Sequence, residues 1–196
     1  AVSIIAKEVE KLGPTCYERD IQFIHLYLRD LNITPMTKVE AEGEFQDDIF
    51  IAKTIKQIDG SVPKFKILSI DIETYAEKKE INPERNPILM IGFYGVDEEN
   101  NVFEKVITWR QFNHNLDYLE VVGSEEELLS RFAEILIEYS PDIITGYYTD
   151  GFDFPYIKTR AEKLGVPLKI GKDKSNIQIY SRPRNVEEKI TGYLHL

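Results

Sequence analysis

Residues 65–74 read FKILSIDIET, an apolar strand pattern with two carboxylates near its end. Alternate residues of a β-strand point to the same side, so we expect Asp71 and Glu73 to project together from one face. Ile70 and Ile72 then point from the other face into a core. Two carboxylates so close repel each other, and a divalent cation would stabilise them. Because Mg²⁺ and Mn²⁺ prefer such oxygen ligands, the stretch indicates a metal-binding strand.

Acidic pairs of this form also occur without a function. Charged residues are common enough that one Asp-x-Glu triplet is expected by chance in a chain of 196 residues, and its ordinary place is a solvent-facing strand edge. The position of this pair favours a site, because ligands of α/β proteins gather at the ends of strands. Both interpretations stay open on the triplet alone.

The segments after residue 62 alternate between strand and helix patterns. Apolar runs predict strands at residues 65–73, 87–96, 104–109, 142–148 and 189–196. The acidic turn DEENN at residues 97–101 makes the second and third of these an antiparallel hairpin. We therefore expect a mixed sheet of at least four strands, flanked by helices, in which the first strand is central.

Two helices are predicted within this part of the chain. Ser124 and Glu127 have the spacing of a capping box. Apolar residues follow it at helical spacing, namely Leu128, Phe132, Ile135, Leu136 and Tyr139. The second helix covers residues 152–165, with Pro155 in its first turn and Gly165 at its C-terminal end.

The first 62 residues form a separate, small α+β segment in this interpretation. Residues 17–32 predict a helix that Asp20 would cap. Its apolar face consists of Ile24, Tyr27, Leu28 and Leu31. Residues 39–58 predict two short strands with Asp47 and Asp48 near the turn, and the break at Gly60–Pro63 separates domain 1–62 from domain 63–196.

The overall charge does not suggest a nucleic acid as partner. The chain has 34 acidic and 24 basic residues, a net charge of −10, whereas phosphate binding usually goes with a basic surface. Residues 158–189 are the exception, with nine lysines and arginines against four acidic residues. That stretch indicates either a face for a phosphate chain or solvated loop charge.

Other residue counts exclude several classes of protein. The single cysteine, Cys16, leaves no disulfide framework or zinc ribbon and fits a reducing compartment. The three histidines are scattered, so they are not expected to bind metal. No apolar run reaches the ~20 residues of a membrane helix, and the charged start is not a signal peptide. We expect a cytoplasmic protein that does not contact membranes.

A third carboxylate belongs with the first two. In GYYTDGFDFPYI, residues 146–157, Asp153 lies between two phenylalanines where a strand gives way to a helix. It could simply cap that helix, and Asp150 beside Gly151 suits a turn. Carboxylates from two elements could instead hold two metal ions ~4 Å apart, an arrangement that activates water for phosphodiester cleavage.

These motifs resemble the 3′→5′ proofreading exonuclease region of family B DNA polymerases, in particular the archaeal ones. The family's first exonuclease motif, of the form FDIET, is matched by Ile70 to Thr74. Its second, an Asn followed two or three residues later by Phe-Asp, is matched by Tyr148 to Asp153. KVITW, LEVVGSEEELLSRF, YSPDIITGY and GYLHL follow in the family's order. YERDIQFIHLYLRDLNITPM resembles the link to the family's N-terminal domain, so the resemblance covers nearly the whole chain.

The resemblance implies a ribonuclease-H-like (DnaQ-like) fold and a two-metal nuclease. Asp71 and Glu73 would ligate Mg²⁺ or Mn²⁺, and Asp153 would complete the site. The reaction would be hydrolysis of the last phosphodiester at a single-stranded 3′ end, for proofreading by a DNA-directed DNA polymerase. The third motif, a Tyr followed by an Asp, is expected beyond Leu196, so the domain is truncated and the two-metal site incomplete here.

The resemblance also implies contacts to DNA. The residues concerned are Thr74, Tyr148, Phe152, Arg182 and Arg184. Tyr148 departs from the family, which has Asn at this position, so it would lose a contact to the strand, stack on a base or fill the core. Arg182 and Arg184 resemble a hairpin that helps to separate the strands, although loop charge is the ordinary interpretation.

Partners and alternatives complete the hypothesis. The expected partners are primer–template DNA, the rest of a polymerase chain and, through it, a sliding clamp. One alternative is a catalytically inactive exonuclease-like module that is structural or binds single-stranded DNA. Another is a stand-alone nuclease of the same fold. Because the Asp of the third motif is expected beyond Leu196, the isolated segment is expected to be inactive or weakly active.

Overall fold

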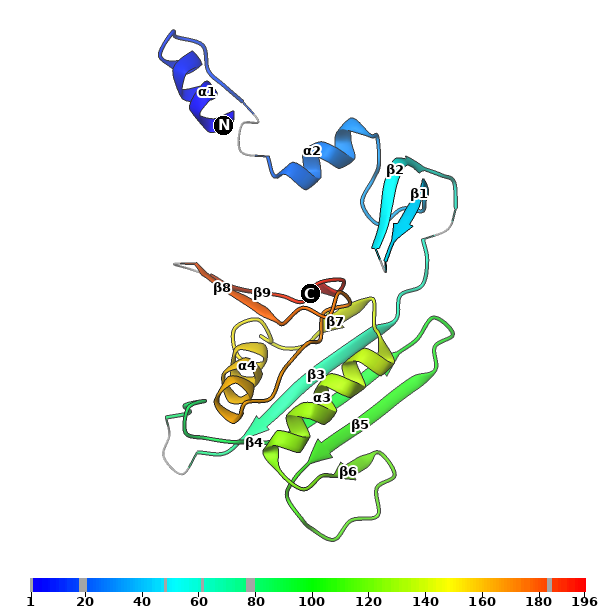
Figure 1. The fold of residues 1–196 in the computed structure, drawn as a ribbon, viewed down its shortest axis with the longest axis vertical. Coiled ribbons are helices and arrows are strands. Elements are labelled where there is room, and N and C mark those ends of the chain that lie inside the picture. The colour runs from blue at the N-terminus through cyan, green and yellow to red at the C-terminus, as the bar shows by residue number, and fades with distance from the viewer. Residues whose placement is uncertain (1, 18–20, 48, 61, 77–79, 183–184) are drawn as a thin grey trace. The chain divides into compact units, whose positions relative to one another are not determined.

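The computed structural model describes residues 2–17, 21–47, 49–60, 62–76, 80–182 and 185–196. The chain divides into two compact units, which are described separately (Figure 1). The first unit runs from Ala1 to Pro63 and the second from Lys64 to Leu196.

The described residues of the first unit form two short helices and one hairpin. The helices are α1 (Val2–Glu10) and α2 (Phe23–Asp30), and the strands are β1 (Val39–Gln46) and β2 (Ile49–Gln57). The strands pair antiparallel, which confirms the two strands predicted for residues 39–58. Asp47 has a left-handed φ of 53° at the turn, and Asp48 lies outside the described residues.

Helix α2 is shorter than predicted. The expected helix over 17–32 fails at its start because Gln22 is extended (φ −60°, ψ 143°) and offers no side-chain cap. Asp20, the predicted cap, lies outside the described residues. The predicted apolar face is largely exposed, with Ile24 at 52% and Tyr27 at 40%.

The second unit is built on a six-stranded mixed sheet. Its strands, in chain order, are β3 (Ile67–Thr74), β4 (Ile88–Val96), β5 (Val102–Thr108), β6 (Leu119–Val121), β7 (Ile143–Thr145) and β10 (Leu194–His195). The spatial order is β10-β7-β3-β4-β5-β6. Strand β3 is antiparallel to β4 and parallel to β7, so it lies inside the sheet, as its apolar sequence predicts.

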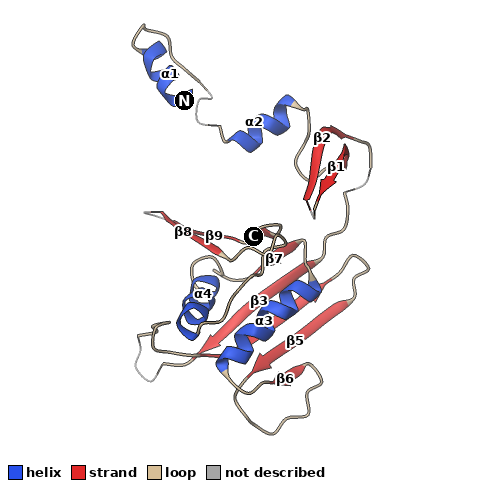
Figure 2. Ribbon diagram, viewed as in Figure 1, coloured by secondary structure: helices blue, strands red, loops and turns tan. Residues whose placement is uncertain are grey.

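Helices α3 (Glu125–Tyr139) and α4 (Asp153–Leu164) supply the other layer. Helix α3 packs on β4, β5 and α4, and Figures 1 and 2 show it lying over the sheet, roughly along the direction of the strands. Ser124 caps α3 by accepting the Glu127 N–H, as predicted, while the Glu127 carboxylate accepts from Gly123. The core joins both helices to β3, with Leu68, Ile70, Phe132, Leu136, Phe154 and Ile157 among its fully buried side chains.

Several strand boundaries differ from those predicted. The strand expected over 142–148 ends at Thr145, and the chain turns into a loop there. The strand expected over 189–196 divides, because Gly192 has a left-handed φ of 90° between β9 (Asn185–Lys189) and β10. Strand β9 pairs with β8 (Gln178–Arg182) in a separate hairpin, which the apolar pattern does not predict but which the family resemblance at Arg182 implies.

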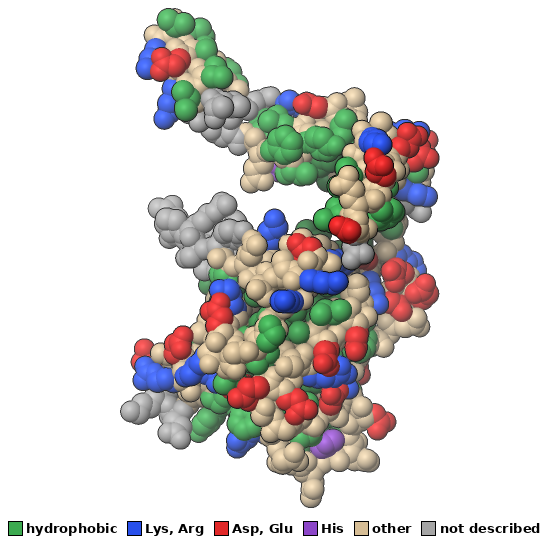
Figure 3. Space-filling view, viewed as in Figure 1, with side chains coloured by type: hydrophobic (Ala, Val, Ile, Leu, Met, Phe, Trp, Pro, Cys, Tyr) green, Lys and Arg blue, Asp and Glu red, His purple; other side chains and the backbone are tan. Residues whose placement is uncertain are grey.

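Charges of both signs are mixed on the second unit. Figure 3 shows lysines and arginines interspersed with acidic side chains on the face in view. Lys158, which belongs to the basic stretch 158–189, pairs with Glu162 at 2.9 Å, so part of that stretch is neutralised locally. None of the described helices is both long and apolar enough to cross a membrane.

Candidate active site

Side chains of β3 point alternately to the two faces of the sheet, and two carboxylates lie on the same face. Ile70 and Ile72 are 1% and 5% exposed and belong to the core. Asp71 and Glu73, which alternate with them, are exposed. The predicted division of this strand into an apolar and an acidic face is therefore confirmed.

Asp153 approaches the same strand from helix α4. It is the first residue of the helix and is only 2% exposed. Its carboxylate Oδ1 accepts a hydrogen bond of 3.0 Å from the Ile72 N–H. The cap position of α4 belongs to Phe152, which makes no side-chain cap bond. The carboxylate is thus tied to β3, and a role as the simple N-cap of α4 does not fit.

The surroundings of Asp153 disfavour its charge. Burial raises the pKa of this carboxyl above its ordinary value of 3.8, and the negative charge of Asp71 raises it further. The Ile72 N–H and the His195 ring act in the opposite direction. Asp71 and Asp153 are therefore near enough to interact electrostatically, although they lie 82 positions apart in the sequence.

The donor chemistry of these carboxylates fits a hard divalent cation. Asp71 supplies an exposed carboxylate, and Asp153 carries a buried one whose charge a cation would neutralise. Glu73 projects from the same face of the strand as Asp71. Among the described residues, however, no three His, Cys, Asp or Glu side chains are grouped closely enough to hold a metal ion. The described structure brings Asp71 and Asp153 together but does not gather a complete ligand set.

The loop of residues 146–152 delivers Asp153 to this position. It begins at Gly146, where a Cβ atom would lie 2.6 Å from the Ile70 carbonyl oxygen and 2.4 Å from Thr149 Cγ2. Only glycine fits so near the neighbouring strand. Thr149 is 3% exposed, so the middle of the loop is also packed against the rest of the unit.

Two tyrosines point outward from the same loop. Tyr147 is 93% exposed and Tyr148 is 69% exposed. Tyr148 has a left-handed φ of 58°, a conformation that bulky residues rarely adopt and that Asn tolerates well. Its carbonyl oxygen accepts hydrogen bonds from Gly151 and Phe152, which closes the turn. The interpretation of Tyr148 as a core-filling aromatic is therefore wrong.

The remaining predicted DNA contacts are placed only in part. Thr74 is half-buried, and the Phe152 and Tyr156 rings pack with their centroids 5.4 Å apart. Arg182 lies in β8, but its side chain is outside the described part of the structure. Arg184 lies outside the described residues altogether.

Three polar residues were assigned no joint role from the sequence. His195 Nε2 lies 2.7 Å from Thr149 Oγ1, and His195 Nδ1 lies 2.5 Å from Asp150 Oδ1. The turn position predicted for Asp150 is correct, but its carboxylate is also paired. No sequence signal points to this contact, because 45 residues separate Asp150 from His195.

A buried ion pair stabilises the elements around the candidate site. Arg160 of α4 donates to both carboxylate oxygens of Glu125 at 2.8 and 2.5 Å, and to the Pro83 carbonyl at 2.9 Å. Glu125 also accepts the Ile88 N–H at 2.8 Å. This pair fastens the start of α3 to α4 and to β4, and it holds the helix that carries Asp153.

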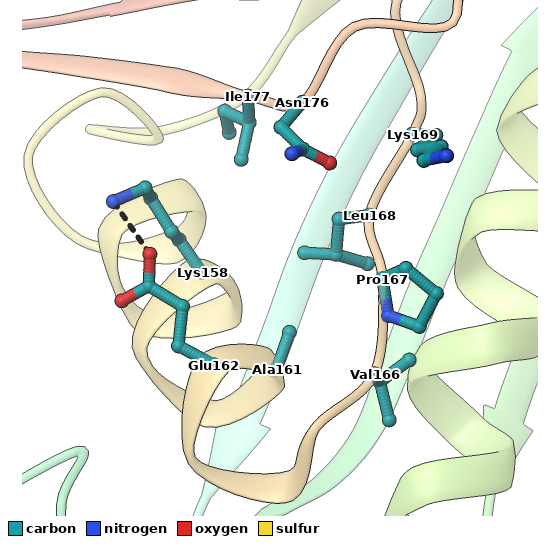
Figure 4. Close-up of a pocket in the computed structure, with 9 residues that line it drawn as sticks. All are labelled: Lys158, Ala161, Glu162, Val166, Pro167, Leu168, Lys169, Asn176 and Ile177. Atoms are coloured by element: carbon teal, nitrogen blue, oxygen red, sulfur yellow. Dashed lines mark ion pairs between the residues drawn. The ribbon is translucent and has the colours of Figure 1, made fainter.

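A separate pocket lies beside α4, and Asp71, Glu73 and Asp153 are not among the residues that line it (Figure 4). Its volume is about 180 Å³, and it is lined by Lys158, Ala161, Glu162, Val166, Pro167, Leu168, Lys169, Asn176 and Ile177. Figure 4 shows the Lys158–Glu162 ion pair at its rim. The pocket is smaller than the ~300–1,000 Å³ typical of ligand sites and contains none of the predicted site residues.

Comparison with known proteins gives a consistent family match. The family model described as DNA polymerase family B, exonuclease domain, matches residues 15–196. A DNA polymerase of Methanocaldococcus jannaschii is 38% identical over 180 residues, which cover 92% of this chain and 10% of that protein. DNA polymerase 1 of Pyrococcus abyssi is 35% identical over 200 residues, covering 96% of this chain and 25% of that protein.

The fold agrees with a solved structure. The family B DNA polymerase from Pyrobaculum calidifontis superposes with a TM-score of 0.68 and 23% identity, over 100% of this chain and 24% of that one. At this identity the match shows only that the two chains share a fold. The chain spans about a tenth to a quarter of the length of the relatives it matches.

Proposed function

The chain belongs to DNA polymerase family B through the exonuclease domain of that family, and from this premise we propose that it is the 3′→5′ proofreading region of a longer DNA-directed DNA polymerase. Residues 63–196 would be the exonuclease domain, and residues 1–62 the end of the N-terminal domain with its linker. The substrate would be the single-stranded 3′ end of a primer. The product would be a nucleoside monophosphate.

One observation carries this proposal. The Asp153 carboxylate, which is buried in α4, bonds the β3 backbone between the two exposed acids Asp71 and Glu73. Burial raises its pKa and the charge of Asp71 raises it further, so the ionised form of Asp153 is disfavoured there. A perturbed carboxyl that interacts with another acid is typical of catalytic sites.

We assign the three carboxylates to a divalent cation, Mg²⁺ or Mn²⁺. When bound, such ions supply an activated water and neutralise charge that develops on the phosphate. The contribution of this chain is to fix the ligands. Strand β3 holds Asp71 and Glu73 two positions apart, and the Ile72 N–H orients Asp153. A ligand from beyond Leu196 would complete a two-metal set.

The outward tyrosine and the nearby polar residues would contact the DNA strand. Tyr148 is exposed and presents a ring that a base could stack on. Thr74, Phe152, Arg182 and Arg184 are proposed to line the path of the strand. The partners would be primer–template DNA, the rest of the polymerase and, through it, a sliding clamp, in the cytoplasm.

A second candidate function is a non-catalytic module that holds single-stranded DNA or supports the polymerase. The observation in its favour is that the described residues group no three metal-ligating side chains. The replacement of the family's Asn by Tyr148 also favours a non-catalytic module. Under this alternative, DNA binding would be independent of metal, and no nucleotide would be released.

The deciding experiment is Asp71→Ala in the full-length polymerase that contains this segment. We expect trimming of a 5′-labelled single strand to fall to background while primer extension continues, because only the exonuclease carboxylate is removed. Asp117→Ala, which changes an exposed aspartate of the same unit, is the matched control and should trim like the parent. Equal trimming by parent and Asp71→Ala would refute the assignment, and no trimming by either would favour the non-catalytic module.

A further inference from the structure

The His195 imidazole joins two side chains of the 146–152 loop. Its Nε2 lies 2.7 Å from Thr149 Oγ1 and its Nδ1 lies 2.5 Å from Asp150 Oδ1. The His195 side chain is 10% exposed, and its ring packs nearly perpendicular to the Phe154 ring, with the centroids 5.2 Å apart and an interplanar angle of 84°. Both ring nitrogens are therefore engaged by one loop, and the ring cannot turn without losing both contacts.

The two contacts differ in kind. His195 Nε2 and Thr149 Oγ1 form a hydrogen bond whose donor depends on the tautomer of the ring, whereas His195 Nδ1 approaches Asp150 Oδ1 at ion-pair distance without the geometry of a hydrogen bond. A hydroxyl, a histidine and a carboxylate in this order also form the pattern of an activated nucleophile. Thr149 is 3% exposed, however, so its hydroxyl is closed to a substrate. The arrangement therefore suits holding the loop rather than attacking a bond.

The position of His195 is itself fixed by the sheet. Strand β10 pairs parallel with β7, with His195 opposite Ile144. The Leu196 N–H donates to the Ile144 carbonyl at 3.0 Å, so backbone bonds secure the histidine to the strand that leads into the loop. The loop is thus held at its start by β7 and at its middle by the side chain of the neighbouring strand.

A short chain of bonds leads from this contact to Asp153. The Thr149 carbonyl accepts the Phe154 N–H at 3.1 Å, one residue past Asp153. Asp153 in turn accepts the Ile72 N–H. A loop that lost its hold on Thr149 would release the first turn of α4, and the Asp153 carboxylate would lose its fixed position beside Asp71.

We propose that His195 is a positioning residue for the exonuclease reaction, which acts by clamping Thr149 and Asp150 so that Asp153 stays against β3. This inference rests on the proposed function, because the carboxylate it positions is a member of the proposed site. It assigns no metal ligation and no contact with DNA to His195. It also gives Thr149 a role, as the buried hydroxyl through which the histidine acts.

The test uses His195→Ala and His195→Gln in the full-length polymerase, with His25→Ala as the matched control. His25 is exposed and lies in the other unit. Removing residues that orient metal ligands typically costs about 10-fold to 100-fold in affinity or activity. We expect His195→Ala to lower the trimming rate by about 10-fold to 100-fold. Its affinity for Mn²⁺, measured by calorimetry, should fall by a similar factor. Primer extension should be unchanged.

Two further readouts separate positioning from general stability. Hydrogen exchange should become faster in peptides that contain Ile72 and Phe154, while peptides from α3 keep the protection of the parent. His195→Gln keeps a polar group that can accept from the Thr149 hydroxyl, so it should recover part of the lost activity. Thr149→Val should show the same exchange pattern, and combining it with His195→Ala should add little.

The outcomes distinguish this inference from the proposed function. If Asp71→Ala stops trimming but His195→Ala trims like the parent and leaves Ile72 protected, His195 has no positioning role and the exonuclease assignment stands. If Asp71→Ala trims normally, the assignment fails, and this inference falls with it. If His195→Ala does not fold, Thr149→Val decides, and normal protection of Ile72 in that variant overturns the inference.

Discussion

Two buried acidic residues of the second unit have opposite electrostatic surroundings. Glu125 is 8% exposed and meets the Arg160 guanidinium with both oxygens, while the Ile88 N–H fills a further acceptor site. Asp153 is 2% exposed and accepts from the Ile72 N–H. Within the described part of the chain it makes no ion pair with a lysine or arginine, and the charged neighbour that most affects it is Asp71, another acid.

The difference indicates which charge serves the fold and which serves a site. A buried charge that a partner neutralises can be retained for structure. A buried charge placed next to a like charge costs stability, and such groups concentrate where a protein acts on something else. On this argument Glu125 holds α3 to α4, whereas Asp153 has the electrostatic surroundings expected of the proposed cation ligand.

The largest effect predicted by this comparison is on stability. Glu125→Ala should lower the free energy of unfolding by about 3–5 kcal/mol, because it leaves the buried Arg160 guanidinium without a counter-charge. Urea denaturation of the second unit measures the change. Glu126→Ala is the matched control, since its exposed carboxylate is the next residue on the helix and should cost under ~1 kcal/mol. A cost of Glu125→Ala no larger than the control would contradict a structural role for the pair.

The next effect concerns the loop that carries Asp153. Gly146→Ala should cost about 1–3 kcal/mol, because the new Cβ would meet the backbone oxygen of Ile70 at 2.6 Å and push the loop from β3. Gly92→Ala is the control on the adjacent strand, where the nearest atom to a new Cβ is 4.0 Å away. Thermal unfolding compares the two variants, and equal melting temperatures would show that the loop has room to shift.

Much of the fold could be predicted because it depends on local pattern. The alternation from Ile70 to Glu73 determined the buried and exposed faces of β3, and the capping residues marked where α3 begins. The left-handed Gly165 ends α4 as its position in the sequence suggested. The short strands β6 and β10 were missed or misplaced, since two or three residues carry too little pattern to outweigh the turns around them.

The candidate site could be predicted only as far as its carboxylates. Asp71 and Glu73 are candidates because they share one face near the end of an apolar strand, and Asp153 because it lies where a strand gives way to a helix. The contacts that hold them are pairings across long stretches of sequence, such as Arg160 with Glu125 and His195 with Thr149. The periodicity of the sequence does not predict pairs that lie so far apart along the chain. Asp150 and His195 each suit an ordinary role when considered alone, and only the fold joins them.

The smallest effect, and the most direct test of the comparison, comes from replacing each acid with its amide. Glu125→Gln should destabilise the protein, whereas Asp153→Asn should raise the free energy of unfolding by about 1 kcal/mol at pH 7 in chelator-treated buffer. Asparagine retains an oxygen for the Ile72 N–H and removes the charge that burial and Asp71 oppose. The two amide substitutions should therefore have opposite signs.

The gain in free energy of unfolding from Asp153→Asn should depend on pH, because the pKa of Asp153 is raised. Because the folded protein binds this proton more tightly than the unfolded chain, stability is lost as pH rises from the ordinary value of 3.8 through the raised pKa. The advantage of Asp153→Asn should then be complete above the raised pKa and shrink as pH falls toward 3.8. Thermal melts of parent and variant across that range measure it. A variant less stable than the parent at every pH would mean that the Asp153 carboxylate contributes to the fold as Glu125 does, and the contrast between the two acids would be lost.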